Sequence, residues 1–141
     1  MTQQRPASSV TFLYFEDLHA AKEFFSSVLG LEQVLDQRWA AIYRTGQTGF
    51  LGACDARKAS VSVASRGGVL ISLNVDDVET WHARIARLGA SNQESVSNLT
   101  AIKENAEIGL KSFFFKGPEG YDFEIQEFTR PHDRKQFMPE C

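Results

Sequence analysis

The chain repeats one pattern of predicted secondary structure, and this repeat constrains the fold more than any other feature. A shift of 60 residues brings Val10 onto Leu70 and aligns 16–18 (Glu-Asp-Leu) with 76–78 (Asp-Asp-Val). One deletion in the helical part then brings Gly30 onto Gly89. In both copies the order is strand, helix and three strands. A curled sheet with a helix on its convex side leaves its concave side free, so two such units are expected to close one cavity.

The first copy reads clearly from local signals. Residues 10–15 are β-branched and aromatic, as in a strand. Asp17 suits a helix N-cap, apolar residues then recur at spacings of three and four, and Gly30 suits the helix end. Three antiparallel strands are expected to follow, at 33–35, 39–43 and 48–54.

The second copy follows the same order with a less regular middle. A strand is predicted at 69–75, followed by a helix that Asp76 or Asp77 caps and Gly89 ends. Glu79 lies three residues after Asp76, as in a capping box. The rest is predicted as a weak strand at 92–99, an irregular loop at 100–109, and strands at 110–115 and 121–128.

The stretch 113–128, FFFKGPEGYDFEIQEF, predicts two antiparallel strands joined by a tight turn. Pro118 and its flanking glycines supply the backbone angles that such a turn requires. After the turn the pattern has period two, with Phe123 and Ile125 on one face and Glu124 on the other. That second face lies either in solvent or in a cavity, and its environment decides what Glu124 can do.

The predicted fold class is α+β, with two tandem βαβββ units that form a curled, mostly antiparallel sheet around a central cavity and carry their helices outside. This cavity can close within one chain or across a dimer by exchange of units. The chain is read as one domain made of a flexible N-terminus at 1–9, a first unit at 10–54, a linker at 55–68, a second unit at 69–128 and a C-terminal tail at 129–141.

Composition excludes several kinds of partner. The net charge of −3 comes without a large basic block, so nucleic acid is not an expected partner. No apolar run approaches the roughly 20 residues of a membrane helix, and the polar N-terminus does not resemble a signal peptide. These features predict a cytoplasmic protein without a membrane partner. Cys54 and Cys141 do not make a disulfide framework.

The segments 17–32 and 113–128 resemble the vicinal oxygen chelate superfamily, which includes glyoxalase I, bleomycin-resistance proteins, fosfomycin-resistance enzymes and extradiol dioxygenases. The resemblance covers roughly residues 10–128. The stretch GPEGYDFEIQ is similar to the terminal motif D-P-x-G-x-x-x-E of this superfamily, although Gly117 replaces the aspartate. The resemblance implies the paired-unit fold, a small-molecule partner and a homodimer.

Metal-dependent members of the superfamily hold a divalent ion with His or Glu from four strand positions. Carried over by the resemblance, these positions fall on Val10, near Gly52, on Leu70 and on Glu124. Only Glu124 has a donor atom, and a divalent ion needs several converging ligands. We therefore predict neither a metal site nor another cofactor.

Aromatic residues and a few polar residues are the candidates for contact with a flat, partly apolar molecule. The predicted ligand-binding residues are Phe12, Tyr14, Trp39, Tyr43, Phe50, Ser72, Asn74, Phe113 and Glu124. Glu124, Tyr14 and Asn74 would be the polar anchors. Core packing is an equally simple role for the aromatic residues, because the sequence does not fix which side of the 33–54 strands each residue faces.

Two functions are weighed. The resemblance implies a metal-free protein that binds a small organic molecule, with antibiotic sequestration as one form of that activity. The alternative is a lyase, isomerase or dioxygenase of the glyoxalase type, which would use a metal or Glu124 alone as the acid or base. In the first case no residue is catalytic; in the second Glu124 is the candidate. A third reading is an interaction domain with a filled interior.

Overall fold

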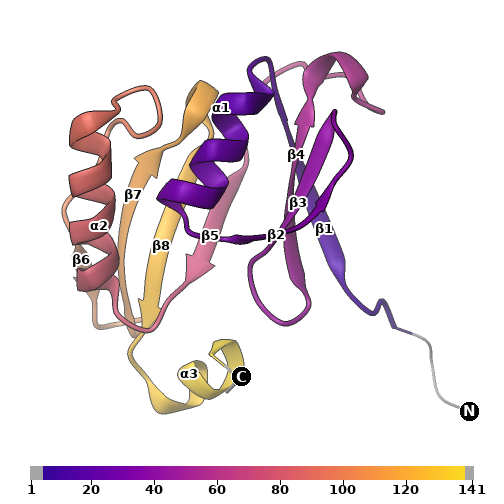
Figure 1. The fold of residues 1–141 in the computed structure, drawn as a ribbon. Helices are drawn as coiled ribbons and strands as arrows, with labels where there is room; N and C mark the ends of the chain where they lie inside the picture. The colour runs from indigo at the N-terminus through magenta and orange to yellow at the C-terminus, as the bar shows by residue number, and fades with distance from the viewer. Residues whose placement is uncertain (1–4, 139–141) are drawn as a thin grey trace, which may run out of the picture. The chain divides into compact units, whose positions relative to one another are not determined.

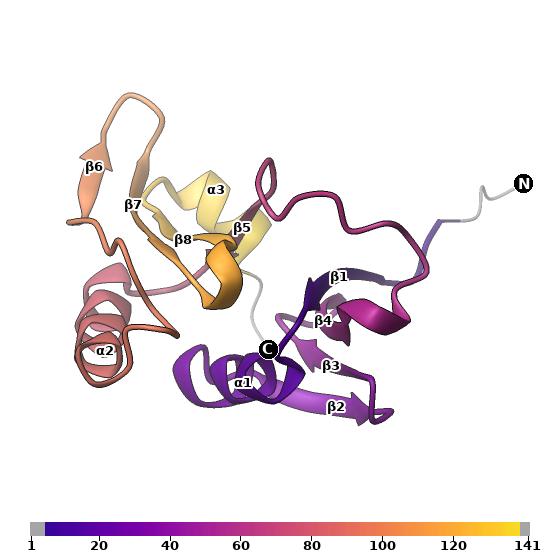
Figure 2. The same ribbon diagram turned by 90° about the horizontal axis from the view of Figure 1, so that it is seen from above.

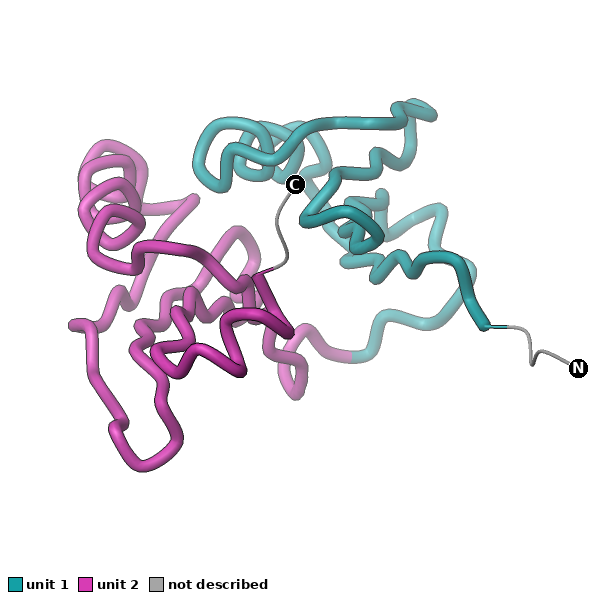
Figure 3. The backbone as a smooth tube through the Cα atoms, turned by 90° about the horizontal axis from the view of Figure 1, so that it is seen from below, with its two compact units in different colours: residues 1–64 teal, residues 65–141 magenta. Residues whose placement is uncertain are grey.

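The computed structural model describes residues 5–138 (Figures 1 and 2). The chain divides into two compact units, residues 1–64 (unit 1) and residues 65–141 (unit 2), shown in Figure 3. Each unit holds one mixed four-stranded sheet, so the α+β fold of two βαβββ-like units is confirmed. The predictions for residues 1–4 and for Cys141 lie outside the described residues.

Unit 1 follows the predicted order of elements. Its helix is short and ends in a π-helical turn at Phe24–Val28, and the sheet order is β1-β4-β3-β2. The pair β1 and β4 is parallel, and the other two pairs are antiparallel. The elements are β1 (Ser9–Phe15), α1 (Leu18–Glu23), β2 (Glu32–Asp36), β3 (Ala40–Arg44) and β4 (Gly49–Asp55), followed by a 3₁₀ turn at Ala56–Lys58.

Local chemistry explains where α1 begins and where its turn ends. Asp17 accepts a hydrogen bond from the backbone N–H of Ala20 at 3.1 Å, as an N-cap residue does. Gly30 has φ = +68°, a left-handed conformation that glycine adopts at little cost. The helical segment covers one face of the sheet, where the ring of Phe25 packs against the rings of Phe15 and Tyr43.

Unit 2 repeats the topology, with the sheet order β5-β8-β7-β6 and a parallel β5–β8 pair. Its elements are β5 (Leu70–Asn74), α2 (Val78–Ser91), β6 (Lys103–Asn105), β7 (Leu110–Lys116), a 3₁₀ turn at Pro118–Gly120, β8 (Asp122–Phe128) and α3 (Pro131–Phe137). Figure 2 shows α2 along one side of this sheet.

The core of unit 2 lies between α2 and its sheet. The rings of Phe113, Phe115 and Phe123 stack in sequence on this side, and all three side chains are buried. Ile85 of α2 is fully buried as well. The N-cap of α2 is Asp77 rather than Asp76, because the Asp77 carboxylate accepts from the backbone N–H groups of Glu79 and Thr80.

The middle of unit 2 differs from the sequence prediction. Its edge strand is β6, within the stretch 100–109 that was predicted as a loop. The stretch 92–99 holds only an isolated bridge between Ser97 and Lys116. Residues 103–105 are Lys, Glu and Asn, which all have low strand preference, and pairing with β7 makes them a strand.

Gly89 does not end α2, which continues to Ser91. A Cβ at Gly89 would lie 3.0 Å from the Val96 side chain, so this glycine allows the chain after the helix to approach closely. The predicted C-terminal tail also contains a helix, α3, whose Phe137 ring stacks on Phe128. Within residues 5–138, no helix is long and apolar enough to cross a membrane.

Candidate functional site

The candidate site is built on the sheet face of unit 2 that α2 does not cover. Strand alternation turns Phe123 and Ile125 toward the helix side, where both are fully buried, and turns Glu124 to the opposite side. We call this side the open face of unit 2. Its residues pair across β5, β8 and β7 in three rows: Leu70–Asp122–Lys116, Ser72–Glu124–Phe114 and Asn74–Gln126–Ser112.

Glu124 lies at the centre of this open face. Its side chain is only 8% exposed, and Ser72 Oγ donates to its Oε1 at 2.7 Å. Among residues 5–138 this hydroxyl is the only polar partner of the carboxylate. An ionised carboxylate offers about four acceptor positions, so most of the acceptor capacity of Glu124 is unused.

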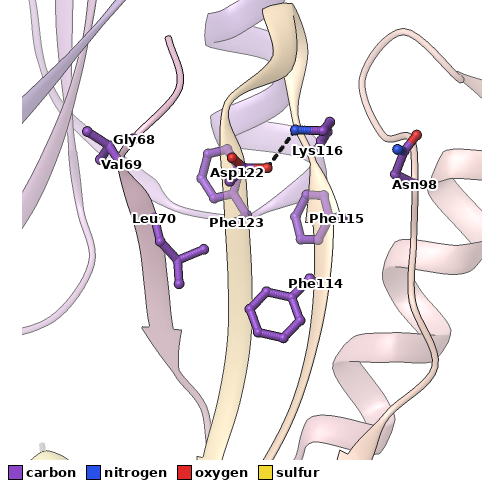
Figure 4. Close-up of a pocket in the computed structure, with 9 residues that line it drawn as sticks. All are labelled: Gly68, Val69, Leu70, Asn98, Phe114, Phe115, Lys116, Asp122 and Phe123. Carbon is purple, nitrogen blue, oxygen red and sulfur yellow. Dashed lines mark hydrogen bonds and ion pairs between the residues drawn. The ribbon is translucent and has the colours of Figure 1, made fainter.

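A depression of about 420 Å³ lies over the first row of the open face. Glu124 does not line it, but Phe114, which pairs with Glu124 across β7 and β8, does. Figure 4 shows Leu70 and Phe114 beside Lys116 and Asp122 in its lining. The Lys116 Nζ atom lies 2.8 Å from Asp122 Oδ1, so this cation and this anion neutralise each other. The depression therefore combines an apolar floor with one internal ion pair.

The third row of the open face is an amide pair. Gln126 Nε2 donates to Asn74 Oδ1 at 2.7 Å, which joins β8 to β5. The predicted anchor Asn74 thus lies on the same face as Ser72 and Glu124 and already has one partner. Its own N–H groups and the remaining acceptor positions of Gln126 face away from this bond.

The corresponding face of unit 1, opposite α1, has a different chemical character. We call it the open face of unit 1; its paired rows across β1, β4 and β3 are Val10–Phe50–Arg44, Phe12–Gly52–Ile42 and Tyr14–Cys54–Ala40. The Phe12 ring lies over Gly52, where any Cβ would clash with it. The Arg44 guanidinium is centred 5.1 Å from the Phe50 ring, a cation–π distance. This face is mainly apolar and aromatic.

The strand registers make the two open faces directly comparable. Phe12 pairs with Gly52 in unit 1, and Ser72 pairs with Glu124 in unit 2, on the middle row of each face. Gly52 is therefore the counterpart of Glu124. Where unit 2 carries a hydroxyl bonded to a carboxylate, unit 1 carries an aromatic ring over a glycine.

Tyr43 and Phe113 are corrections to the predicted ligand-binding set, because both are fully buried on the helix side of their sheets. The Tyr43 hydroxyl lies 3.4 Å from the Lys22 carbonyl oxygen and 3.3 Å from Gln33 Oε1, and burial raises its pKa. The Phe113 ring packs 4.8 Å from His82 of α2. Both residues hold a helix to its sheet, and neither reaches an open face.

The other predicted residues are placed as follows. Phe12, Tyr14 and Phe50 share the open face of unit 1, and Ser72, Asn74 and Glu124 share that of unit 2. Trp39 precedes β3 and is 48% exposed. Sequence reasoning missed the pair Lys116–Asp122 and its neighbour Phe114. The predicted 113–128 hairpin could have revealed this pair, since residues flanking its turn oppose each other.

The donor set does not fit the divalent ion of the superfamily. Unit 1 supplies Val10 and Gly52 at the two positions, and neither side chain has a donor atom. Unit 2 supplies Leu70, again without a donor, and Glu124. One carboxylate is far short of the several ligands that a divalent ion takes.

An acidic group formed by Asp77, Glu79 and Glu127 lies at the start of α2. Two of its members already serve the helix. Asp77 accepts from the first-turn N–H groups, and Glu127 Oε1 accepts from the Val78 N–H at 3.0 Å. Carboxylates in this position stabilise a helix N-terminus by meeting its free donors. The group is thus explained by helix capping.

Residues 8–125 match the Glyoxalase/Bleomycin resistance protein/Dioxygenase superfamily, and the chain belongs to this superfamily. No curated protein matches it in sequence.

Solved structures share the fold at low sequence identity. One is a lactoylglutathione lyase from Agrobacterium tumefaciens, with TM-score 0.67 and 24% identity over 87% of this chain and 95% of that one. A glyoxalase/bleomycin resistance protein/dioxygenase from Nocardioides has a TM-score of 0.69 and 19% identity, over 92% of this chain and 88% of that one. The fosfomycin resistance protein FosX from Listeria monocytogenes has a TM-score of 0.69 and 14% identity, over 93% of this chain and 99% of that one. At these identities the likeness shows the fold.

Proposed function

We propose that this protein binds a small organic molecule through residues of its open faces, without a metal ion. The observation that carries the proposal is the middle row of each open face. Three of the four superfamily ligand positions lack a donor atom, and the Phe12 ring lies over Gly52 at one of them. An exposed aromatic ring suits an apolar, planar ligand rather than a cation with bound water.

The two open faces offer different kinds of contact to a small molecule. Phe12, Phe50 and Tyr14 offer aromatic area in unit 1. Ser72 and Glu124 offer a hydroxyl and a carboxylate in unit 2, beside the depression. Small-molecule sites combine a mostly apolar lining with a few convergent polar groups. The open face of unit 2 has this composition by itself, with Leu70 and Phe114 near Ser72 and Glu124.

The metal-free part of the proposal is tested by elemental analysis of protein purified without chelator, beside a thermal-shift series of divalent ions. We expect no stoichiometric metal and no ion-dependent rise in melting temperature. About one metal per chain that is lost in Glu124→Ala would overturn it, because tight binding to the folded state stabilises that state.

The binding part is tested by a ligand-observed NMR screen of planar aromatic compounds, followed by calorimetry. Phe12→Ala is expected to weaken binding of a hit about tenfold. A bound ligand would cover roughly half of the ring, so the loss is about half of what full burial of a phenylalanine contributes. Phe137→Ala is the matched control, since Phe137 is an exposed phenylalanine of α3 that stacks on Phe128 of unit 2 and does not belong to the open face of unit 1. Equal losses in the two variants would speak against binding on the open face of unit 1.

Sequestration is the proposed consequence of binding. A sequestering protein lowers the free concentration of its ligand without changing it chemically, so protection should require about one protein chain per ligand molecule. The fosfomycin resistance protein among the structural neighbours makes antibiotics reasonable first compounds. Catalytic amounts of protein that destroy the compound would favour the second candidate below.

The second candidate is an enzyme of the glyoxalase type in which Glu124 is the acid or base. The buried position of Glu124 and its bond to Ser72 favour it, because a general base must be held in place. Glu124→Gln would then abolish turnover while ligand binding remains. Retained turnover in this variant would exclude Glu124 as the acid or base.

A further inference from the structure

We infer that the ligand of the open face of unit 2 carries a protonated amine, which binds to Glu124. This inference rests on the proposed function and names the chemical class of the ligand. It comes from the environment of one carboxylate.

Glu124 is largely buried, although its Oε2 atom keeps some access to solvent. Its side chain is 8% exposed, and one serine hydroxyl is its single donor among the described residues. No donor reaches its Oε2 atom within residues 5–138. A buried carboxylate is stable when it is paired and hydrogen-bonded, so this one lacks a cationic partner.

The three lysines on the strands of unit 2 are placed elsewhere. Lys116 is paired with Asp122 on the neighbouring row. Lys111 lies on the helix side and pairs with Glu79. Lys103 is exposed on edge strand β6, two strands from β8, on the row of Ser112. In the part of the chain that the structure describes, none of the three forms an ion pair with Glu124.

The surroundings of Glu124 fit an organic ammonium rather than a bare ion. Phe114 lies directly across from Glu124 on β7 and is exposed, and Leu70 lies on the adjacent row. The depression over these side chains can hold an apolar body of modest size (Figure 4). Phe114 connects the depression with the middle row, because it lines the depression and pairs with Glu124. A ligand whose apolar body lies against Phe114 would place an ammonium group at Glu124, beside an aromatic ring that attracts cations.

The test uses three probes with one aromatic body and different charge: 2-naphthylmethylamine, 2-naphthylmethanol and 2-naphthoate. Calorimetry at neutral pH compares them on the wild-type protein, on Glu124→Gln and on Glu94→Gln. Glutamine keeps the shape of the side chain and an acceptor for Ser72. Glu94 is an exposed glutamate after α2 and controls for net charge.

The amine is expected to bind about tenfold more tightly than the alcohol, the size of one favourable charged contact. Naphthoate should bind most weakly. The preference for the amine over the alcohol should disappear in Glu124→Gln and persist in Glu94→Gln. The comparison of amine and alcohol on the wild-type protein needs no variant, so the result does not depend on how Glu124→Gln folds.

Equal affinity for amine and alcohol on the wild-type protein would overturn the inference and leave the proposed function standing. A preference that survives Glu124→Gln would also overturn it, because the cation would then bind elsewhere. Absence of binding by all three probes at millimolar concentration would count against both the inference and the proposed function.

Discussion

At the scale of single residues, two of the exchanges on the middle row of the open faces are linked. Phe12 stands where unit 2 has Ser72, and Gly52 stands where unit 2 has Glu124. The two exchanges depend on each other, because the Phe12 ring occupies the space that a side chain at position 52 would need. A ring can lie flat on a strand only where the residue beneath it is this small.

Gly52→Ala should therefore have opposite effects in two backgrounds. With Phe12 present, the new Cβ must displace the ring, and we expect a loss of about 1 kcal/mol in the free energy of unfolding. In a Phe12→Ala background, the same change should stabilise by about 0.5 kcal/mol, because alanine restricts the unfolded chain. Urea denaturation of the four proteins measures the coupling. Additive effects would show that ring and glycine do not interact.

Asp55 provides a prediction in terms of pH. Hydrogen bonds from the Arg57 side chain and backbone N–H lower its pKa to about 2. Because the folded pKa lies below the unfolded one, the stabilisation is present above the unfolded pKa and is lost as pH falls through about 2. Arg57→Gln should raise the Asp55 pKa toward 3.8, measured by carboxyl NMR titration. An unchanged titration would mean that the backbone donor alone sets the pKa.

At the scale of elements, both helices begin at an aspartate that follows a strand. The α2 cap is the stronger of the two, since Asp77 accepts from two backbone N–H groups and from the Thr80 hydroxyl. These hydrogen bonds, with that of the Thr80 side chain first, lower the pKa of Asp77. The carboxylate also lies at the positive end of the helix dipole.

Asp77→Ala should lower the melting temperature by about 3 °C, because it removes the acceptor for the first turn of α2. Asp77→Asn is the control, since asparagine keeps a side-chain oxygen and caps nearly as well. Differential scanning calorimetry measures both. Equal losses in the two variants would mean that the charge of Asp77, rather than its hydrogen bonds, stabilises α2.

Local signals made most elements predictable, and pairing between distant segments explains the exceptions. Asp17, Asp77 and the apolar helix stripes depend on residues within a few positions of each other. The strand β6 depends on its partner β7, and the close approach of the chain at Gly89 depends on Val96, seven residues later. Neither dependence can be read from the segment itself.

The candidate site was predictable to the extent that strand alternation was. Strand alternation placed Glu124 on the face opposite Phe123 and Ile125. The resemblance identified Gly52 as the corresponding position in unit 1. Tyr43 and Phe113 were assigned to the ligand because an aromatic residue suits a pocket and a core equally. Only the sheet register shows that both face a helix.

At the scale of the whole molecule, the repeat produces two units that share a topology and differ in the chemistry of their open faces. Each unit buries its own aromatic core between helix and sheet. The side chains of the open faces are not part of these two cores. Their side chains can therefore differ between the units without loss of the fold.

We predict that the chain forms a homodimer in solution. Large apolar side chains stay exposed on the open faces, among them Val10, Phe12, Leu70 and Phe114, and exposed apolar patches of this kind mark contact surfaces. Light scattering coupled to gel filtration should give twice the chain mass of 15.8 kDa. A mass of one chain across micromolar concentrations would contradict the prediction.

The shared register of the two units has a consequence for protein engineering. Each row of one sheet has an equivalent row in the other. The residues of one unit can therefore guide substitutions at the equivalent positions of the other unit. Phe12→Ser together with Gly52→Glu would copy the hydroxyl–carboxylate arrangement of one sheet onto its twin. The chain thus contains both an acidic and an apolar version of the same surface, and swapping them needs no change of backbone.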